Sequence, residues 1–228
     1  MNKCYYCGES ATTEEHAPPR CIFPKLKDSP DGRDYRKNLI KVPSCEAHNT
    51  EKSKEDEYLL YCLVMSLPSN EIAKSQFLTK IMRAIQRRPK LIDRLLLHKQ
   101  EVAVHDTEKD EWSRTIAFKP EEQRLVSIFT HIAKAIYHHE KKVSWNGTVI
   151  VIIEFMLSFT NIKQNERQSD LVKELDTMLS TVPHKGDNPD VFSYQFVEVE
   201  GGLFTRFHFY GNSKVVAAYV PSIPEQGR

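Results

Sequence analysis

Apolar side chains recur every three or four residues in two long stretches of the chain, 51–67 and 121–140. This spacing predicts amphipathic helices with one buried face. Pro68 ends the first helix, and Ser69-Asn70-Glu71 has the residue types of a new helix start, so a second helix is predicted to about residue 88. Pro89 fits the first turn of a third, to about residue 99. The two apolar stripes are Tyr58, Tyr61, Cys62 and Met65, and Leu125, Ile128, Phe129, Ile132 and Ile136.

Strand patterns dominate the rest of the chain. Residues 102–118 are polar with weak alternation, which predicts a short hairpin or connector, and residues 148–159 are rich in β-branched residues, which predicts a buried strand. A short helix is expected over residues 169–179. Residues 191–220 predict two or three strands, with turns at Gly201-Gly202 and Gly211-Asn212.

These elements predict an α+β fold with a small N-terminal metal module, a helical middle and a C-terminal antiparallel sheet with helices. Residues 1–50 are dense in Cys, Pro, Gly and Asn. Such a segment cannot build much core, so it needs a cross-link such as a bound metal to hold its shape. We divide the chain into a metal module (1–66), a basic helical segment (67–100) and an α+β domain of unknown role (101–228).

Composition narrows the class of protein. The chain has 228 residues, of which 40% are hydrophobic and 28% charged, as in ordinary soluble globular proteins. The most apolar stretch, residues 149–159, is too short to span a membrane and contains Glu154. No secretory signal is visible at the N-terminus, so we expect a cytoplasmic protein with no membrane partner. The formal net charge is only +1, but residues 74–99 carry eight Lys or Arg against the single acid Asp93.

Four of the candidate metal ligands occur as two pairs, Cys4-x-x-Cys7-Gly8 and Cys45-x-x-His48. Two such pairs can complete a tetrahedron around zinc, and a site filled by four protein ligands is structural because no position is left for substrate. With five cysteines in a reducing compartment, this pattern favours metal over disulfides. Cys21 and Cys62 fit neither pair and are expected to be ordinary buried thiols.

Between these pairs lie residue types that suit phosphodiester hydrolysis, which needs a base to deprotonate water and a cation at the phosphate. His16 can be the base, and Glu15 offers oxygen to a hard divalent cation. At a strand end the two side chains would leave on opposite faces unless a bulge or turn redirects them. Asn38 and Asn49 can orient the base or complete the shell of the ion, and Lys52, one helical turn after Asn49, can meet a phosphate.

The order of these motifs over residues 4–53 resembles the HNH endonuclease family. The resemblance implies a ββα-metal core, a β-hairpin and helix around one ion, in which His16 is the general base. Glu15 and Asn49 would hold the catalytic Mg²⁺ or Mn²⁺, and Asn38 would position the imidazole. The separate structural zinc would be held by Cys4, Cys7, Cys45 and His48.

Three positions depart from the pattern of the family. Glu15 stands where Asp is more usual, His48 where a cysteine is more usual, and Asn49 where His is frequent. None of these changes removes a required group, although the longer Glu15 side chain could weaken or reposition the ion.

The leading hypothesis is therefore a metal-dependent HNH endonuclease that hydrolyses DNA, with DNA favoured over RNA. By the same resemblance, small HNH proteins with an extra domain are typical of bacterial or phage defence systems. One alternative is a zinc-stapled nucleic-acid-binding module without activity, and another is a nuclease held idle by its C-terminal domain. A homodimer or an activating protein partner is compatible with either. The residues expected to contact the phosphate backbone, rather than to form only a solvated helix face, are Lys52, Lys80, Arg83, Arg87, Arg88 and Lys90, with Arg94.

Overall fold

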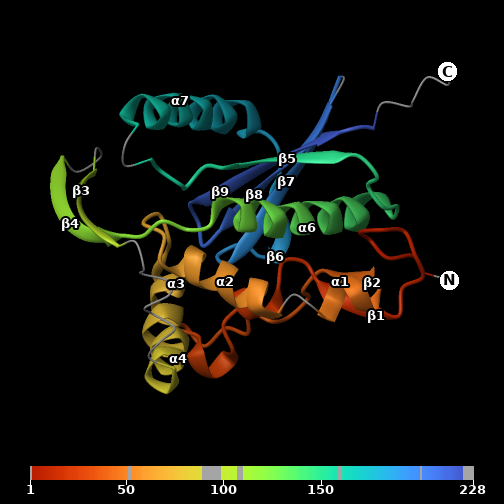
Figure 1. Cartoon of the computed structure of the whole chain (residues 1–228), viewed down its shortest axis with the longest axis horizontal. Helices are drawn as coiled ribbons and strands as arrows, with labels where there is room; N and C mark the ends of the chain where they lie inside the picture. The colour runs from red at the N-terminus through yellow and green to blue at the C-terminus, as the bar shows by residue number, and fades with distance from the viewer. Residues whose placement is uncertain are drawn as a thin grey trace.

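A computed structural model describes residues 2–50, 53–88, 99–106, 110–158, 161–200 and 202–222 of the chain. Its main body is a five-stranded antiparallel sheet in the order β5-β9-β8-β7-β6, with α6 on one face and α7 on the other (Figure 1). The predicted α+β class is therefore confirmed. The strands of this sheet are β5 (Thr148–Ile153), β6 (Lys185–Asn188), β7 (Phe192–Val199), β8 (Gly202–Phe209) and β9 (Ser213–Val220), and the helices are α6 (Glu122–Lys141) and α7 (Ile162–Leu179).

The N-terminal part contains a small hairpin of β1 (Thr13–His16) and β2 (Lys41–Ser44), which pair antiparallel. The loop between these strands holds two short 3₁₀ helices, η1 (Arg20–Ile22) and η2 (Leu26–Asp28). After β2 come α1 (Glu46–Thr50) and α2 (Ser53–Val64). Tyr58, Tyr61 and Cys62 of the predicted apolar stripe are buried, because α2 packs against both η1 and α6.

The predicted second helix is observed from residue 71 to residue 87. It consists of α3 (Glu71–Gln76), a π-helical turn, η3 (Phe77–Ile81), and α4 (Met82–Arg87). Asn70 caps it, since its side-chain oxygen accepts hydrogen bonds from the backbone N–H groups of Ile72 and Ala73. Residues 89–98, and with them most of the predicted third helix, lie outside the described residues.

The weakly alternating segment forms a hairpin of β3 (Gln100–Asp106) and β4 (Glu111–Ala117), as one of the two predicted alternatives had it. This hairpin projects from the body (Figure 1), and its polar pattern follows from its exposure on both faces. Trp112 is 70% exposed and stacks on His105.

The core lies between α6 and the sheet. All five residues of the predicted α6 stripe are buried, and Phe129 packs on Phe209 of β8. One cluster of buried apolar residues extends from Cys4 and Tyr5 in the N-terminal turn to Tyr219 in β9. The three predicted segments therefore share one core, and the division itself stays a prediction.

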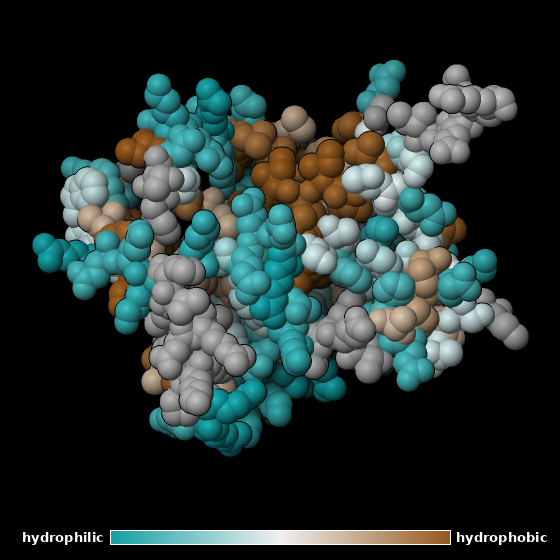
Figure 2. All heavy atoms as spheres, in the orientation of Figure 1, coloured by the Kyte–Doolittle hydropathy of each residue, from teal (hydrophilic) through white to brown (hydrophobic). Residues whose placement is uncertain are grey.

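Two predictions about the C-terminal half need correction, and one strand was not predicted. The strand expected over residues 148–159 ends at Ile153 and is an edge strand, not a buried one. Its face toward α7 is open, with Ile150 53% and Ile152 39% exposed, and Figure 2 shows apolar atoms gathered where β5 and β9 lie. The helix expected from residue 169 begins at Ile162, after a cap by Asn161. Strand β6 was not predicted, because its sequence KGDN has no apolar alternation.

Tyr210, at the end of β8, joins the sheet to the N-terminal half. Its backbone oxygen accepts a hydrogen bond from the backbone N–H of Asn70 (3.0 Å). Its hydroxyl accepts one from the Gln76 amide (2.7 Å) and donates one to the backbone oxygen of Ile22. Close by, the hydroxyls of Ser66 and Ser213 are 2.6 Å apart. Among the described residues, no helix is long and apolar enough to cross a membrane.

Candidate metal centre and catalytic site

Cys4, Cys7, Cys45 and His48 come together at one point, where the N-terminal turn meets the end of β2 and α1. The candidate ligand atoms all lie within 4.8 Å of one another. The Cys7 and Cys45 sulfurs are 3.9 Å apart, and His48 Nδ1 lies 3.8 Å from the Cys4 sulfur and 3.1 Å from the Cys45 sulfur. The turn is held by a bond from the Gly8 N–H to the Cys4 oxygen (2.9 Å), and Gly8 has the positive φ of 77° that this turn requires.

This geometry fits a tetrahedral metal. Zinc–sulfur bonds of about 2.3 Å place two thiolates about 3.8 Å apart on a tetrahedron, close to the Cys7–Cys45 separation of 3.9 Å. Burial opposes ionisation of Cys4, but the backbone N–H groups of Cys7, Cys45 and Tyr6 outweigh it and lower the pKa of this thiol. The cluster can hold a structural metal ion such as zinc, with four protein ligands, as the spacing predicted.

Aromatic contacts attach the cluster to α6. The ring of Tyr6 packs on His48, with centroids 4.5 Å apart, and stacks on His131 of α6, with centroids 4.2 Å apart. The ammonium of Lys134 lies 4.3 Å from the centre of the same ring. The sequence did not predict these contacts, because only the fold brings residue 6 beside residues 131 and 134.

His16 is the last residue of β1, opposite Lys41 in β2. It is half-buried. Burial, Lys41, Arg20 and Arg36 lower the pKa of the imidazole, while Glu14 opposes them. His16 is therefore neutral near pH 7, which is the protonation state that a general base needs.

Glu15 and Asn49 lie on the other side of β1. Successive residues of a strand point to opposite faces, so Glu15 shares a face with Thr13 and His16 does not. The Asn49 amide donates to the hydroxyl of Thr13 (3.0 Å), which places it on the Glu15 side. Burial and the Glu15 carboxylate raise the pKa of the Tyr5 phenol, so Glu15 faces Tyr5. The two oxygen ligands expected for a catalytic ion thus share one face, and the expected base points away from it.

Asn38 has a positive φ of 51° and is exposed. In the part of the chain that the structure describes, no hydrogen bond joins it to His16. The left-handed conformation is one that Asn adopts more readily than most residues, which gives Asn38 a role in the turn before β2. Lys52 and Lys90 lie outside the described residues, as does Arg94.

The remaining basic residues surround a hollow of about 250 Å³ between η2 and α4. Arg83 is paired with Asp28 (2.9 Å), and the Lys80 ammonium donates to the backbone oxygen of Cys21 (2.8 Å). Arg88 is paired with Glu57 (3.2 Å). The hollow is lined by the four predicted residues, Lys80, Arg83, Arg87 and Arg88, together with two that the sequence did not single out, Lys25 and Lys27.

Cys21 and Cys62 are not part of the metal cluster. Cys62 is buried, and the Cys21 thiol, which is half-buried, donates to the backbone oxygen of Asp56 (3.2 Å). Burial raises the pKa of both thiols to about 12, so neither is a thiolate at neutral pH. Both are inert thiols, although Cys21 is less buried than the sequence predicted.

Comparisons of the chain with protein-family models, with curated proteins and with solved structures found no match.

Proposed function

We propose that this protein is a metal-dependent endonuclease of the HNH type that hydrolyses DNA phosphodiesters. One observation carries the proposal. The candidate metal cluster fixes α1 to the β1–β2 hairpin, and the same hairpin presents a neutral, half-buried His16 among cations. A hairpin followed by a helix, with a histidine at the end of the first strand, is consistent with the family that the motif order resembles.

His16 would take a proton from the attacking water. Arg20 and Lys41 act electrostatically on the imidazole, and such cations also attract the phosphate that the water attacks. By keeping the imidazole neutral, they leave its lone pair available at physiological pH.

Basic residues continue from His16 to the hollow beside α4. Burial together with Arg36 lowers the pKa of both His16 and Lys80, so Arg36 lies between the two regions electrostatically. Such a series can follow a phosphate backbone without reading its sequence. Its members are Lys41, Arg20 and Arg36 near His16, and Lys25, Lys80, Arg83, Arg87 and Arg88 around the hollow.

Glu15 and Asn49 are the residues that would hold Mg²⁺ or Mn²⁺. A carboxylate oxygen and an amide oxygen are ligands that a hard cation prefers. The hydrogen bond from Asn49 to Thr13 holds Asn49 on the face of β1 that Glu15 shares. When bound, the cation would neutralise charge that builds on the phosphate.

A zinc-stapled nucleic-acid-binding or partner-gated module is the second candidate. It is favoured by the contacts that Glu15 and Asn49 make, because Glu15 faces Tyr5 and Asn49 bonds to Thr13, away from His16. In this candidate the cluster and the basic series act without hydrolysis, or hydrolysis requires a partner that rearranges these side chains.

The test is conversion of supercoiled plasmid to nicked or linear DNA with Mg²⁺ or Mn²⁺, comparing the native protein with His16→Ala. Loss of a general base lowers the rate about 10²–10⁴-fold. His138→Ala is the matched control, because His138 is also a half-buried histidine and lies in the last turn of α6. All three proteins should keep their metal. Equal cleavage by native protein and His16→Ala would contradict the assignment of the base, and no cleavage by metal-loaded native protein would favour the second candidate.

A further inference from the structure

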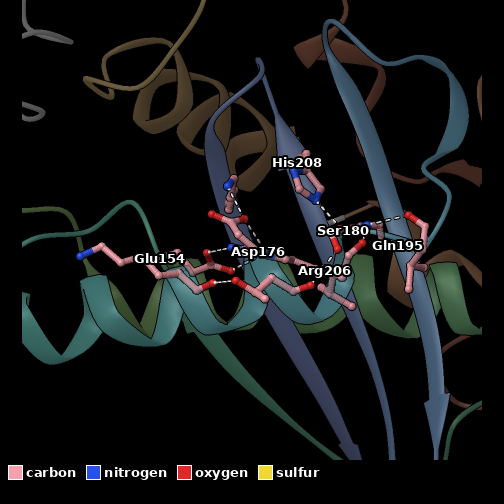
Figure 3. A network of polar contacts seen from close by, with 11 residues as sticks. Glu154, Asp176, Ser180, Gln195, Arg206 and His208 are labelled. Carbon is pink, nitrogen blue, oxygen red and sulfur yellow. Dashed lines mark hydrogen bonds and ion pairs between the residues drawn. The ribbon is translucent and has the colours of Figure 1, made fainter. Parts of the chain in front are cut away.

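A polar pocket of about 320 Å³ opens on the α7 side of the C-terminal sheet. It lies where the end of α7 meets β7, β8 and the turn between β8 and β9, far along the chain from the metal module (Figure 3). Polar and charged side chains make up most of its lining. Its polar lining includes His184, Gln195, Arg206, His208, Asn212 and Lys214.

The charges of the floor are largely balanced within the protein. Arg206 is 1% exposed, and its guanidinium binds both oxygens of the buried Glu154 and one oxygen of Asp176 (2.7 Å). The Lys214 ammonium donates to the same Asp176 oxygen (2.7 Å). An ammonium has three N–H donors, and this bond uses one. Among the contacts of the described residues, the other two are left for water or a ligand.

The proton positions on His208 follow from its neighbour. The Gln195 amide nitrogen donates to the backbone oxygens of Leu179 (2.9 Å) and Val182 (2.8 Å), which uses both of its hydrogens. Its oxygen is therefore the acceptor in the 3.1 Å contact with His208 Nε2, so Nε2 carries the proton. Burial, helped by His184, Arg206 and Lys214, lowers the pKa of His208 to about 3. The ring is neutral, and Nδ1 holds an unshared pair.

An acceptor and a cation thus stand together on one face of the sheet. His208 and Lys214 are directly opposite each other in β8 and β9, and both line the pocket. Cross-strand neighbours have Cβ atoms about 5 Å apart, which one small group can bridge. A fully ionised anion satisfies Lys214 but meets the unshared pair of His208, whereas an anion that still carries a proton satisfies both.

We propose that this pocket binds a phosphate group that still carries an acidic proton, either as inorganic phosphate or as the phosphomonoester of a nucleotide-sized molecule. The charged phosphate oxygens accept hydrogen bonds from Lys214 and the exposed Asn212 amide, and the P–OH donates to His208 Nδ1. A phosphomonoester retains one proton near its second pKa of about 6, and sulfate has no proton at that pH. The site is independent of the proposed nuclease activity.

The test is isothermal titration calorimetry of the metal-loaded full chain at about pH 6, where inorganic phosphate and about half of a phosphomonoester still carry an acidic proton. Inorganic phosphate, AMP, sulfate and adenosine are titrated at equal ionic strength. Phosphate or AMP should bind at least about tenfold more tightly than sulfate, since a tenfold difference corresponds to one well-formed hydrogen bond. Adenosine should not bind. Tighter binding of AMP would identify a phosphomonoester as the ligand, and tighter binding of inorganic phosphate would identify the free ion.

Two variants locate the binding. Lys214→Met should weaken phosphate binding about tenfold or more, because a charge-assisted contact is lost. Lys173→Met is the matched control, because Lys173 lies on the exposed side of α7 with a side chain 75% exposed, and affinity should not change. If Lys214→Met fails to fold, Asn212→Ala replaces it, since Asn212 lies in the exposed turn and should also weaken binding.

A second measurement uses the native protein. The ¹⁵N resonance of His208 Nδ1, followed by NMR, should move when phosphate is added and stay in place with sulfate. Phosphate could also bind in the basic hollow beside α4, but such binding would not separate phosphate from sulfate or respond to Lys214→Met. Equal affinities for the two anions, no heat with either phosphate or AMP, or an unchanged His208 signal would each overturn the proposal.

Discussion

The metal cluster of the N-terminal module and the buried ion-pair network under α7 both join segments that are far apart in the sequence. The cluster brings residues 4–7 to residues 45–48. The network brings Arg206 of β8 to Glu154, just after β5, and to Asp176 on α7. The difference lies in what completes each one. The cluster has three thiols and an imidazole placed to hold an added ion, whereas the network is complete with the charges of the chain itself.

This difference predicts how each of the two regions loses its structure. Four ligands without their ion lose the binding free energy that helps to hold the N-terminal turn against β2 and α1, although residues such as Tyr5 and Val42 still pack in the core. A buried ion pair, in contrast, fails when one partner is removed, because the other is left as an uncompensated charge. We therefore expect the N-terminal module to lose structure when metal is withheld. We expect the sheet to lose stability when one partner of its buried ion pair is removed.

The largest effect is expected from Cys4→Ser, which removes one ligand of the cluster. The variant should lose its bound metal and the structure of the N-terminal module, because metal-binding free energy is folding free energy in such modules. Metal content by mass spectrometry under native conditions and the melting temperature measure both effects. Cys21→Ser is the matched control, since Cys21 is outside the cluster and a serine hydroxyl can still donate to Asp56. A Cys4→Ser protein that keeps one equivalent of metal and its melting temperature would contradict the assignment.

A smaller effect is expected from Arg206→Met, which leaves the Glu154 carboxylate buried without its partner. Its side chain is 2% exposed, so the free energy of unfolding should fall by about 3–5 kcal/mol. The double variant Arg206→Met with Glu154→Leu should lose less, because no lone charge remains. Urea denaturation of the metal-loaded proteins measures the difference.

The exposed ion pair of Lys173 and Asp170 is the control for that experiment, because it shows how little an exposed pair contributes to stability. Their side chains are 75% and 74% exposed, so Lys173→Met should change the free energy of unfolding by less than about 0.5 kcal/mol. If the double variant is as unstable as Arg206→Met alone, the destabilisation comes from lost packing and not from an unpaired charge.

The sheet should also show a dependence of its stability on pH, which appears gradually as the solution is acidified. His208 has a pKa of about 3 in the folded protein, below its ordinary value of 6.5. The unfolded chain therefore binds this proton first, so the stabilisation is fully present above about pH 6.5 and is lost as the pH falls toward 3. The slope is at most about 1.4 kcal/mol per pH unit. His208→Gln can still donate to Gln195 but does not titrate, so its stability should fall less steeply. If the free energy of unfolding depends on pH equally steeply in the two proteins, titration of His208 does not cause the acid sensitivity of the sheet.

The sequence predicted those features that depend on residues close together in the chain. The helix over residues 122–141 followed from its apolar stripe, and the metal ligands followed from two short spacings. The edge position of β5 could not be predicted, because an uninterrupted apolar run looks the same in a buried strand as in an edge strand with one open face. Strand β6 has no apolar signal at all, since its residues are held by pairing with β7.

The same distinction applies to the two candidate sites. His16 and Glu15 are adjacent in the sequence, and their placement on opposite faces of β1 followed from strand geometry. The polar pocket was not predicted, because its residues come from four separate segments. His208 and Lys214 meet across a turn, Gln195 is supplied by β7, and Asp176 by α7. Arg20, Arg36, Lys25 and Lys27 were missed for the same reason, since they are scattered through the loop between β1 and β2.

The position of Tyr210 has a consequence for how such a chain can change over generations. Its hydroxyl and backbone link the end of β8 to Ile22, Gln76 and Asn70, all of which belong to the other half. A recombination that exchanged only the last two strands for foreign ones would remove one hydrogen-bond partner from the Gln76 amide and one from the Ile22 carbonyl, both of which are buried. The two halves of this protein are therefore expected to be inherited as a unit.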